Sequence, residues 1–277
     1  MSVGLYRGNT RTGAVDPASR GIAYGDGLFE TMRVHAGGVP WWQRHWARLA
    51  AGAARLGIPL PDPGFVAAEV DRLLEGRSEG VLKLVVTRGV GARGYTPAPN
   101  ADADWQLALH PLPVTEVSDG LVLRWCRIRL AHQPLLAGLK HCNRLEQVLA
   151  RAEWLEADAR ERLADEGLLC DQEGSVISAT AANLFVLRGG RWRTPALDGC
   201  GVAGICRQWA IDTLDAEQVR LAPTDVSSAE AVFLCNAVRG ILPVARLDGR
   251  SWPPQPAVAR ARRLLAGAHP AFATEPS

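Results

Sequence analysis

Apolar residues recur along this chain at both helical and strand spacing, and the two kinds of segment are intermixed. Helical spacing predicts helices over about 42–56, 64–75, 143–164 and 256–267, with a further helix that begins near Gly204. Short apolar runs predict strands within 21–34, 81–89, 105–113, 121–128 and 231–235, and two hairpins at 167–170/175–178 and 183–188/191–194. The elements lack the regular strand–helix alternation of a doubly wound sheet, so we predict a mixed α/β fold of the α+β class.

Chain length and two prolines predict a two-domain organisation. A chain of 277 residues is long enough for two modest domains. Pro111 and Pro113 end the predicted strand at 105–113 and indicate a linker at about 114–119. We therefore expect a smaller N-terminal domain over 1–113 and a larger domain over 120–277.

Charge, apolar runs and the spacing of cysteine and histidine argue against several classes of function. A formal charge of +2 provides no excess of positive charge for nucleic acid. No apolar run is long enough to cross a bilayer, and the N-terminal sequence does not resemble a signal peptide, so we expect a cytoplasmic protein. The six cysteines form no C-x-x-C pair and the six histidines no metal-binding pattern, so we predict a reducing compartment and no metal site.

Lysine is scarce in this chain, which makes the position of each lysine informative. Only Lys83 and Lys140 are lysines among 31 lysine and arginine residues. Unlike a guanidinium, a lysine amine can lose its proton, and it can form a Schiff base. Lys140 directly precedes the helix predicted at 143–164, where the helix dipole would lower the pKa of its amine. A general composition bias and a solvated lysine are equally compatible with these facts.

Lys83 carries no predicted role. It alternates with Leu82 and Leu84 in a predicted strand, so we expect its side chain on the face opposite to those two leucines.

Three long segments together resemble the fold-type IV pyridoxal-phosphate enzymes. They are YGDGLFETMRV (24–34), AGLKHCNRLEQVLARAEWLEAD (137–158) and VISATAANLFVLRGGRWRTPALDGCGVAGICRQ (176–208). This group includes branched-chain and D-amino-acid aminotransferases. Within it, residues 80–95 (GVLKLVVTRGVGARGY) and the run KHCNRLEQV are most similar to the 4-amino-4-deoxychorismate lyases. The resemblance implies a two-domain homodimer, a small-molecule substrate and pyridoxal 5'-phosphate as cofactor.

The resemblance also assigns roles to individual residues. It implies that Lys140 binds the cofactor covalently and later transfers protons. Helix starts bind anions without side-chain help, which suits a phosphate contact near Gly204. The full set of implied cofactor residues is Lys140, Arg48, Ser178, Asn183, Gly204, Ile205, Cys206, Asn236 and Ala237. For Asn183, a turn-forming role and a direct contact are equally open, and Arg48 alone would be read as a surface helix arginine.

Ser178 departs from the family pattern, which commonly has a glutamate there to keep the pyridine nitrogen protonated. A hydroxyl can hydrogen-bond the nitrogen but cannot hold a proton on it by charge. This change favours elimination, in which the product becomes aromatic, over transamination. A branched-chain or D-amino-acid aminotransferase and a non-enzymatic cofactor-binding or scaffold protein are the alternatives.

Substrate binding is predicted in the glycine-rich loop that follows the strand at 81–89. Arginine binds carboxylates through two parallel hydrogen bonds, and the implied substrate has two carboxylates. The candidates are Arg93 and Tyr95 in this loop and Arg239 much later in the chain. Arg88 adds a further cation to the flexible loop. For Arg93 or Arg239 taken singly, surface solubility is the favoured explanation in a chain with this many arginines. The resemblance then implies conversion of 4-amino-4-deoxychorismate to 4-aminobenzoate and pyruvate in folate biosynthesis.

Overall fold

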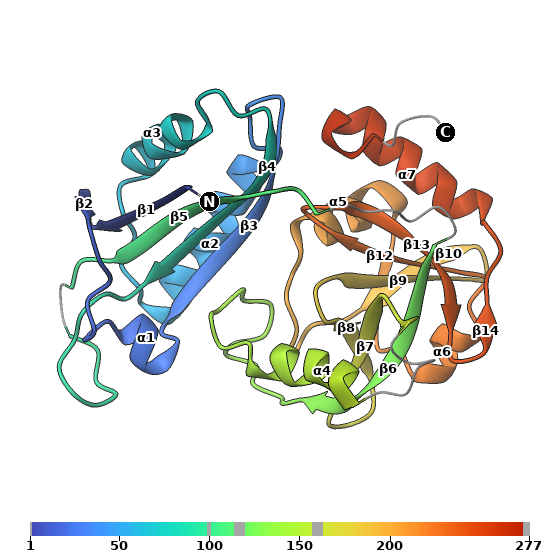
Figure 1. Ribbon diagram of the computed structural model, residues 1–277. Coiled ribbons are helices and arrows are strands. Elements are labelled where there is room, and N and C mark those ends of the chain that lie inside the picture. Colours follow the sequence, from blue (N-terminus) through green and yellow to red (C-terminus); the bar gives the residue numbers. More distant parts are fainter. Residues whose placement is uncertain (1, 99–100, 114–119, 157–162, 274–277) are drawn as a thin grey trace. The chain divides into compact units, whose positions relative to one another are not determined.

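The protein divides into two compact units. The computed structural model describes residues 2–98, 101–113, 120–156 and 163–273 (Figure 1). The first unit contains Met1–Pro113 and Leu139–Asn143, and the second contains Val114–Gly138 and Arg144–Ser277. The linker predicted at 114–119 lies outside the described residues. The membership of Leu139–Asn143 in the first unit was not predicted.

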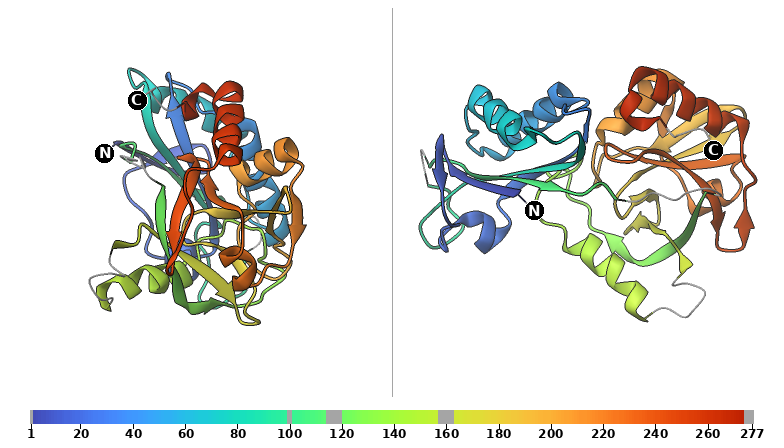
Figure 2. Two further views of the ribbon diagram at one scale, coloured as in Figure 1. Left: turned by 90° about the vertical axis from the view of Figure 1, so that its right-hand side faces the viewer. Right: turned by 45° about the horizontal axis from the view of Figure 1, so that its top comes forward.

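The first unit is built on a five-stranded antiparallel sheet with the order β2-β1-β5-β4-β3. Its strands are β1 (Ser2–Arg7), β2 (Thr10–Thr12), β3 (Gly27–His35), β4 (Glu79–Thr87) and β5 (Asp104–His110). Its helices are α1 (Arg20–Tyr24), α2 (Trp42–Leu56) and α3 (Pro63–Leu74). Figure 2 shows α2 and α3 on one face of this sheet and α1 on the other.

Residue alternation along β3 and β4 decides which face each side chain takes. Met32, Leu82 and Leu84 are buried on the face covered by α2 and α3. Phe29 and Lys83 are only partly buried, and their side chains take the opposite face of the sheet.

The second unit contains a nine-stranded mixed sheet with the order β11-β10-β9-β12-β13-β6-β7-β8, and β14 pairs with β13. Its strands are β6 (Leu121–Leu130), β7 (Glu166–Asp171), β8 (Val176–Ala179), β9 (Asn183–Arg188), β10 (Arg191–Pro195), β11 (Glu217–Val219), β12 (Ala231–Asn236), β13 (Gly240–Leu247) and β14 (Arg250–Ser251). Its helices are α4 (Leu145–Glu156), α5 (Ile205–Leu214), α6 (Pro223–Ser227), α7 (Pro256–Ala268) and the short η2 (Pro270–Phe272). Phe185 and Phe233 stack in its core with ring centroids 4.7 Å apart. The predicted mixed α/β class is confirmed.

Helix α4 exposes its apolar residues. Leu145, Val148 and Leu149, which share one face of the helix, are 75%, 59% and 57% exposed. The buried face carries Glu153 instead. Its carboxylate accepts hydrogen bonds from the backbone N–H groups of Arg127 and Ile128 in β6 at 2.9–3.0 Å. An apolar stripe is therefore left without cover within the described residues.

Candidate functional site

Lys140 lies beside β3, the edge strand of the first unit's sheet. The backbone N–H of Phe29 donates a hydrogen bond to the carbonyl oxygen of Lys140 at 2.9 Å. The N–H of Cys142 donates to the carbonyl oxygen of Gly27 at 2.9 Å. Residues 139–143 therefore extend the sheet as a short additional antiparallel partner of β3.

The side chain of Lys140 projects over an aromatic ring and not from a helix start. Its Nζ lies 4.2 Å from the centroid of the Phe29 ring. Helix α4 begins only at Leu145. The prediction that the helix dipole acts on Lys140 is therefore wrong, because this effect falls off beyond the first turn. A strand edge holds the lysine backbone instead.

Lys83 reaches the same ring as Lys140. As predicted, its side chain leaves the sheet opposite to the buried Leu82 and Leu84. Its Nζ lies 5.6 Å from the Phe29 centroid, so both lysines of the chain approach one phenyl ring. No role was predicted for Lys83. Lysine scarcity, which singled out Lys140, applies to Lys83 equally and could have identified it.

Arg48 belongs to a buried ionic group on the helix-covered face. Arg48 on α2 donates through Nε to Glu30 Oε1 at 2.8 Å, and its Nη2 donates to Oε2 of the same carboxylate. Nδ1 of His45 lies 2.6 Å from Glu30 Oε2. The guanidinium is therefore fixed in place by a strand carboxylate, whereas the sequence alone suggested a surface arginine.

The protonation states of this group follow from its burial and charges. Burial alone would raise the pKa of Glu30, but Arg48 and His45 hold it below its usual range. Burial lowers the pKa of His45, and the charges of Arg48 and Lys140 lower it further, against the opposing effect of Glu30. Nε2 of His45 is buried without a hydrogen-bond partner among the described residues, so a proton there would have no acceptor. His45 is therefore neutral, and Glu30 is charged.

In the second unit, the start of α5 has the form of an anion cradle. Gly204 is its N-cap, and no side chain caps the helix. A Cβ at Gly204 would lie 2.1 Å from Oδ1 of Asn183, so a larger residue would displace the Asn183 side chain or the turn. Uncapped amides at the start of a ten-residue helix favour an anion such as a phosphate.

Cys206 contributes to that cradle through its backbone. Its side chain is fully buried, and a hydrogen bond with Cys235 together with burial keeps the pKa of the Cys206 thiol well above its usual range. The thiol stays protonated, so the groups that can bind an anion are the amides of Ile205 and Cys206.

Two predicted asparagines shape the turns of the second unit. Asn183 donates from Nδ2 to the carbonyl of Val202 at 2.9 Å, in the turn that leads to Gly204. Oδ1 of Asn236 accepts from the N–H groups of Val238 (3.0 Å) and Arg239 (2.8 Å). Each side chain fixes a turn, so only the backbone at Asn236 and Ala237 is left as a contact for a ligand.

Ser178 lies in β8 opposite Leu169 of β7 and is buried. No carboxylate of β8 takes the place of the absent glutamate, because the strand consists of Val176–Ala179 with the sequence VISA.

The predicted substrate residues differ in their surroundings. Arg93 and Tyr95 are exposed, Tyr95 to 85%, and Arg239 is half-buried. Arg88 is not available as a further cation of the loop, because it is buried in an ion pair with Asp26 at 2.7 Å. That part of the prediction is wrong.

Across the described ranges, no group of three or more His, Cys, Asp or Glu residues could hold a metal ion. None of the helices in the part of the chain that the structure describes is long and apolar enough to span a membrane. In the first unit, an amine on a strand edge and a fixed guanidinium fit an aldehyde that carries a phosphate. In the second unit, taken by itself, the start of α5 provides an anion-binding turn.

Comparisons with known proteins identify close similarity to one family. The profile of class IV amino-transferases matches residues 27–247. An aminodeoxychorismate lyase from Vibrio harveyi is 37% identical over 240 residues, which cover 83% of this chain and 86% of that protein. The crystal structure of 4-amino-4-deoxychorismate lyase from Pseudomonas aeruginosa has a TM-score of 0.87 at 38% identity, covering 96% of this chain and 99% of that one. A putative branched-chain-amino-acid aminotransferase from Methanocaldococcus jannaschii is 29% identical over 83% of this chain and 81% of that protein.

Proposed function

Because the chain belongs to the class IV aminotransferase family, we propose that it is a pyridoxal-phosphate-dependent lyase that converts 4-amino-4-deoxychorismate to 4-aminobenzoate and pyruvate. The observation that carries this proposal is the identity of 37–38% to two lyases over most of the chain. An aminotransferase of similar coverage reaches 29%. The proposed place of the reaction is folate biosynthesis, in the cytoplasm.

Lys140 is the proposed catalytic residue. When bound, the cofactor withdraws electrons from the substrate carbon that bears the amine, which makes the C–H bond at that carbon acidic. The Lys140 amine takes the proton from that ring carbon. The neighbouring C–O bond then breaks, its electron pair leaves with the enolpyruvyl group, and protonation of that group gives pyruvate. Loss of the proton and the ether makes the ring aromatic, which drives the reaction forward.

The residues around Lys140 support this role. Backbone hydrogen bonds to β3 fix the lysine while its long side chain can still move between cofactor and substrate. Arg48 is proposed to hold the cofactor phosphate, with its guanidinium oriented by Glu30. In the second unit, the amides at Gly204, Ile205 and Cys206 are proposed as a further phosphate contact. A third contact is proposed at Asn236 and Ala237.

Cations are proposed to bind the substrate's two carboxylates. Lys83 joins the earlier candidates Arg93, Tyr95 and Arg239, because its ammonium lies over the same ring as that of Lys140. A lysine at this position contributes a point charge without the fixed fork of an arginine.

We also propose that the protein is a homodimer. The exposed apolar stripe of α4, formed by Leu145, Val148 and Leu149, is the feature that supports a partner surface.

A substrate comparison tests the function against its main alternative. The protein reconstituted with pyridoxal phosphate is given 4-amino-4-deoxychorismate alone, and separately L-valine or D-alanine with 2-oxoglutarate. The lyase proposal predicts 4-aminobenzoate from the first and little amine transfer in the second. Rapid glutamate formation without 4-aminobenzoate would instead identify an aminotransferase, and cofactor binding without either product would favour a non-enzymatic role.

A further inference from the structure

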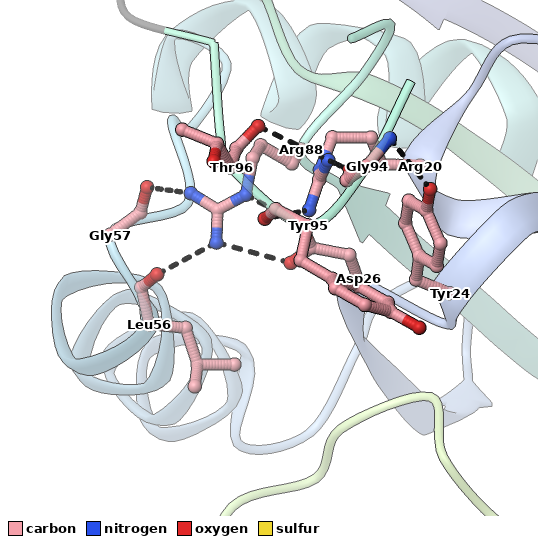
Figure 3. A network of polar contacts seen from close by, with 9 residues as sticks. All are labelled: Arg20, Tyr24, Asp26, Leu56, Gly57, Arg88, Gly94, Tyr95 and Thr96. Carbon is pink, nitrogen blue, oxygen red and sulfur yellow. Dashed lines mark hydrogen bonds and ion pairs between the residues drawn. The ribbon is translucent and has the colours of Figure 1, made fainter. Parts of the chain in front are cut away.

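The loop that carries Arg93 and Tyr95 is fastened to the first unit by Arg20. Arg20 on α1 is only 5% exposed. Its Nη1 donates to the carbonyl of Gly94 and its Nη2 to the carbonyl of Tyr95, each at 2.9 Å (Figure 3). A weaker contact of 3.5 Å reaches the carbonyl of Thr96. The expectation of a flexible loop is therefore not met at these residues, because one buried guanidinium binds consecutive carbonyls of the loop.

Asp26 links Arg20, which binds the loop, to the rest of the first unit. Its carboxylate accepts from Nε of Arg20 at 2.9 Å and from Nε and Nη2 of Arg88 at 2.7 and 3.1 Å. Arg88 in turn donates to the carbonyl oxygens of Leu56 (2.8 Å) and Gly57, at the end of α2. Burial alone would raise the pKa of Asp26, but the two guanidinium partners hold it below its usual range. The carboxylate is therefore charged and shared between two buried cations, as Figure 3 shows.

The same carboxylate directly precedes the strand beside which Lys140 is held. Asp26 is followed by Gly27, whose carbonyl accepts the N–H of Cys142. The neighbouring Phe29 N–H donates to the Lys140 carbonyl. One short stretch of chain therefore contacts Arg20, which binds the candidate substrate loop, and also the lysine segment.

Two glycines let the loop approach Arg20 and the backbone that precedes β5. A Cβ at Gly91 would lie 2.8 Å from Cδ of Arg20. Gly89 has a φ of +83°, and a Cβ there would lie 2.0 Å from the carbonyl oxygen of Asp102. Gly91 therefore lets the loop approach the Arg20 side chain, and Gly89 lets it approach the backbone at Asp102.

The fastening leaves two side chains exposed on a fixed backbone. The N–H of Gly94 donates to the hydroxyl of Tyr24 at 3.2 Å, and the rings of Tyr24 and Tyr95 have centroids 5.4 Å apart. Tyr95 and Arg93 nevertheless point largely into solvent. An exposed aromatic and cation on an immobilised backbone lose little further freedom when a ligand binds, which favours affinity.

We propose that Arg20 and Asp26 are positioning residues that latch the loop and pre-organise Arg93 and Tyr95 for the substrate's carboxylates. The assignment of a substrate to this loop rests on the proposed lyase function. The latch itself, made by Arg20, Asp26 and the 94–96 carbonyls, stands on the geometry alone.

Limited proteolysis of the cofactor-loaded enzyme tests the latch directly. Trypsin can cut after Arg93 and chymotrypsin after Tyr95, and the fragment masses identify each cut. Because two charge-assisted hydrogen bonds to the loop are lost in Arg20→Met, cleavage at these bonds should accelerate on the order of tenfold or more. Arg11→Met removes an exposed arginine from β2 of the same unit and is the matched control, with cleavage as in the wild type. Equal cleavage of the Arg20→Met and wild-type loops would overturn the latch.

A milder variant guards against misfolding of Arg20→Met. Tyr24→Phe removes only the hydroxyl that accepts the Gly94 N–H, on a residue at the surface. It should accelerate the same cleavages by a smaller factor, roughly twofold to fivefold for one neutral hydrogen bond. Unchanged cleavage in this variant and in Asp26→Asn would also count against the latch.

Kinetics then tests positioning. In Arg20→Met and Asp26→Asn, KM for 4-amino-4-deoxychorismate should rise about tenfold while kcat and the cofactor absorption spectrum change little. A fall in kcat with unchanged KM, or faster cleavage with unchanged KM, would contradict the positioning role. If the wild-type enzyme made no 4-aminobenzoate, the lyase proposal would fail while the proteolysis would still decide the latch.

Discussion

At the scale of single residues, Ser178 is the position with the clearest chemical consequence. It lies buried in β8, where the family resemblance expects a carboxylate that would keep the pyridine nitrogen of the cofactor protonated. A hydroxyl provides a weaker electron sink, which an aromatising elimination tolerates better than transamination does. Ser178 therefore has a direct bearing on which reaction the chain performs.

Ser178→Glu should raise amine transfer to 2-oxoglutarate by about tenfold relative to lyase turnover, equivalent to about 1.4 kcal/mol of barrier. A carboxylate would also change the pH titration of the cofactor's absorption, which reports the charge near its ring independently of turnover. Ser178→Ala is the control that removes the hydroxyl without adding charge. If the glutamate variant kept the wild-type ratio of reactions and the wild-type spectrum, Ser178 would not face the pyridine nitrogen.

His45 predicts a pH dependence of stability. Burial depresses its pKa below the roughly 6.5 of an unfolded histidine. As pH falls below that value, the unfolded chain gains a proton that the folded chain does not, so His45 makes the free energy of unfolding decrease by up to about 1.4 kcal/mol per pH unit. The contribution of His45 to the free energy of unfolding is fully present above the pKa of His45 in the unfolded chain. It is lost as the pH falls from that value toward the lower pKa of His45 in the folded chain.

Denaturant titrations at about pH 7.5 and pH 5.5 measure this effect. In His45→Gln the loss of stability between the two pH values should be smaller than in the wild type, although the variant is less stable at both. His110→Gln, at a partly exposed residue of β5, serves as control. An equal loss in the His45 variant and the wild type would mean that His45 does not stay neutral.

At the scale of elements, the start of α5 carries a prediction about cofactor affinity. Gly204→Ala would place a Cβ 2.1 Å from Asn183 Oδ1, so either the turn before the helix or the Asn183 side chain that fixes it must shift. We expect cofactor affinity to fall roughly tenfold or more, about 1.4 kcal/mol, because the amides of the cradle lose their alignment.

Equilibrium dialysis against pyridoxal phosphate measures that affinity. Gly267→Ala on α7 is a matched control, since nothing lies within 4 Å of the added Cβ, and it should bind as the wild type does. Wild-type affinity in Gly204→Ala would contradict the assignment of α5 as a phosphate contact.

The sequence predicted those elements whose pattern is local. Helix α2 was expected at 42–56 and spans Trp42–Leu56, because its apolar spacing and the closing Gly57 (φ 63°) are both read along the chain. The pairing of residues 139–143 with β3 was not predicted, since it joins segments more than a hundred residues apart. For the same reason, helical spacing alone did not reveal that Glu153, and not the leucines, lies on the buried face of α4.

In the candidate site, too, local motifs were predicted and tertiary contacts were not. Motif resemblance named Lys140 and Arg48, but their partners Phe29, Glu30 and His45 come from the tertiary arrangement. Arg88 was misjudged because a sequence does not tell a buried ion-paired arginine from an exposed one.

At the scale of the whole molecule, the exposed stripe of α4 predicts self-association. Leu149→Glu should weaken the proposed homodimer by about 2 kcal/mol, or roughly 30-fold in Kd, since a charge would be placed within an apolar interface. Sedimentation equilibrium measures the change. Leu264→Glu, at an exposed leucine of α7, is the matched control and should leave the dimer intact. A wild-type monomer, or an unchanged dimer in Leu149→Glu, would contradict this use of α4.

The central claim is that this chain is a lyase whose amine is Lys140. The most direct measurement is the amount of 4-aminobenzoate and pyruvate formed from 4-amino-4-deoxychorismate by the cofactor-loaded wild type, Lys140→Ala and Lys83→Met. We expect equimolar products from the wild type, none from Lys140→Ala, and equimolar products with a KM raised about 10- to 100-fold from Lys83→Met. Absence of product from the wild type, or undiminished turnover in Lys140→Ala, would contradict it.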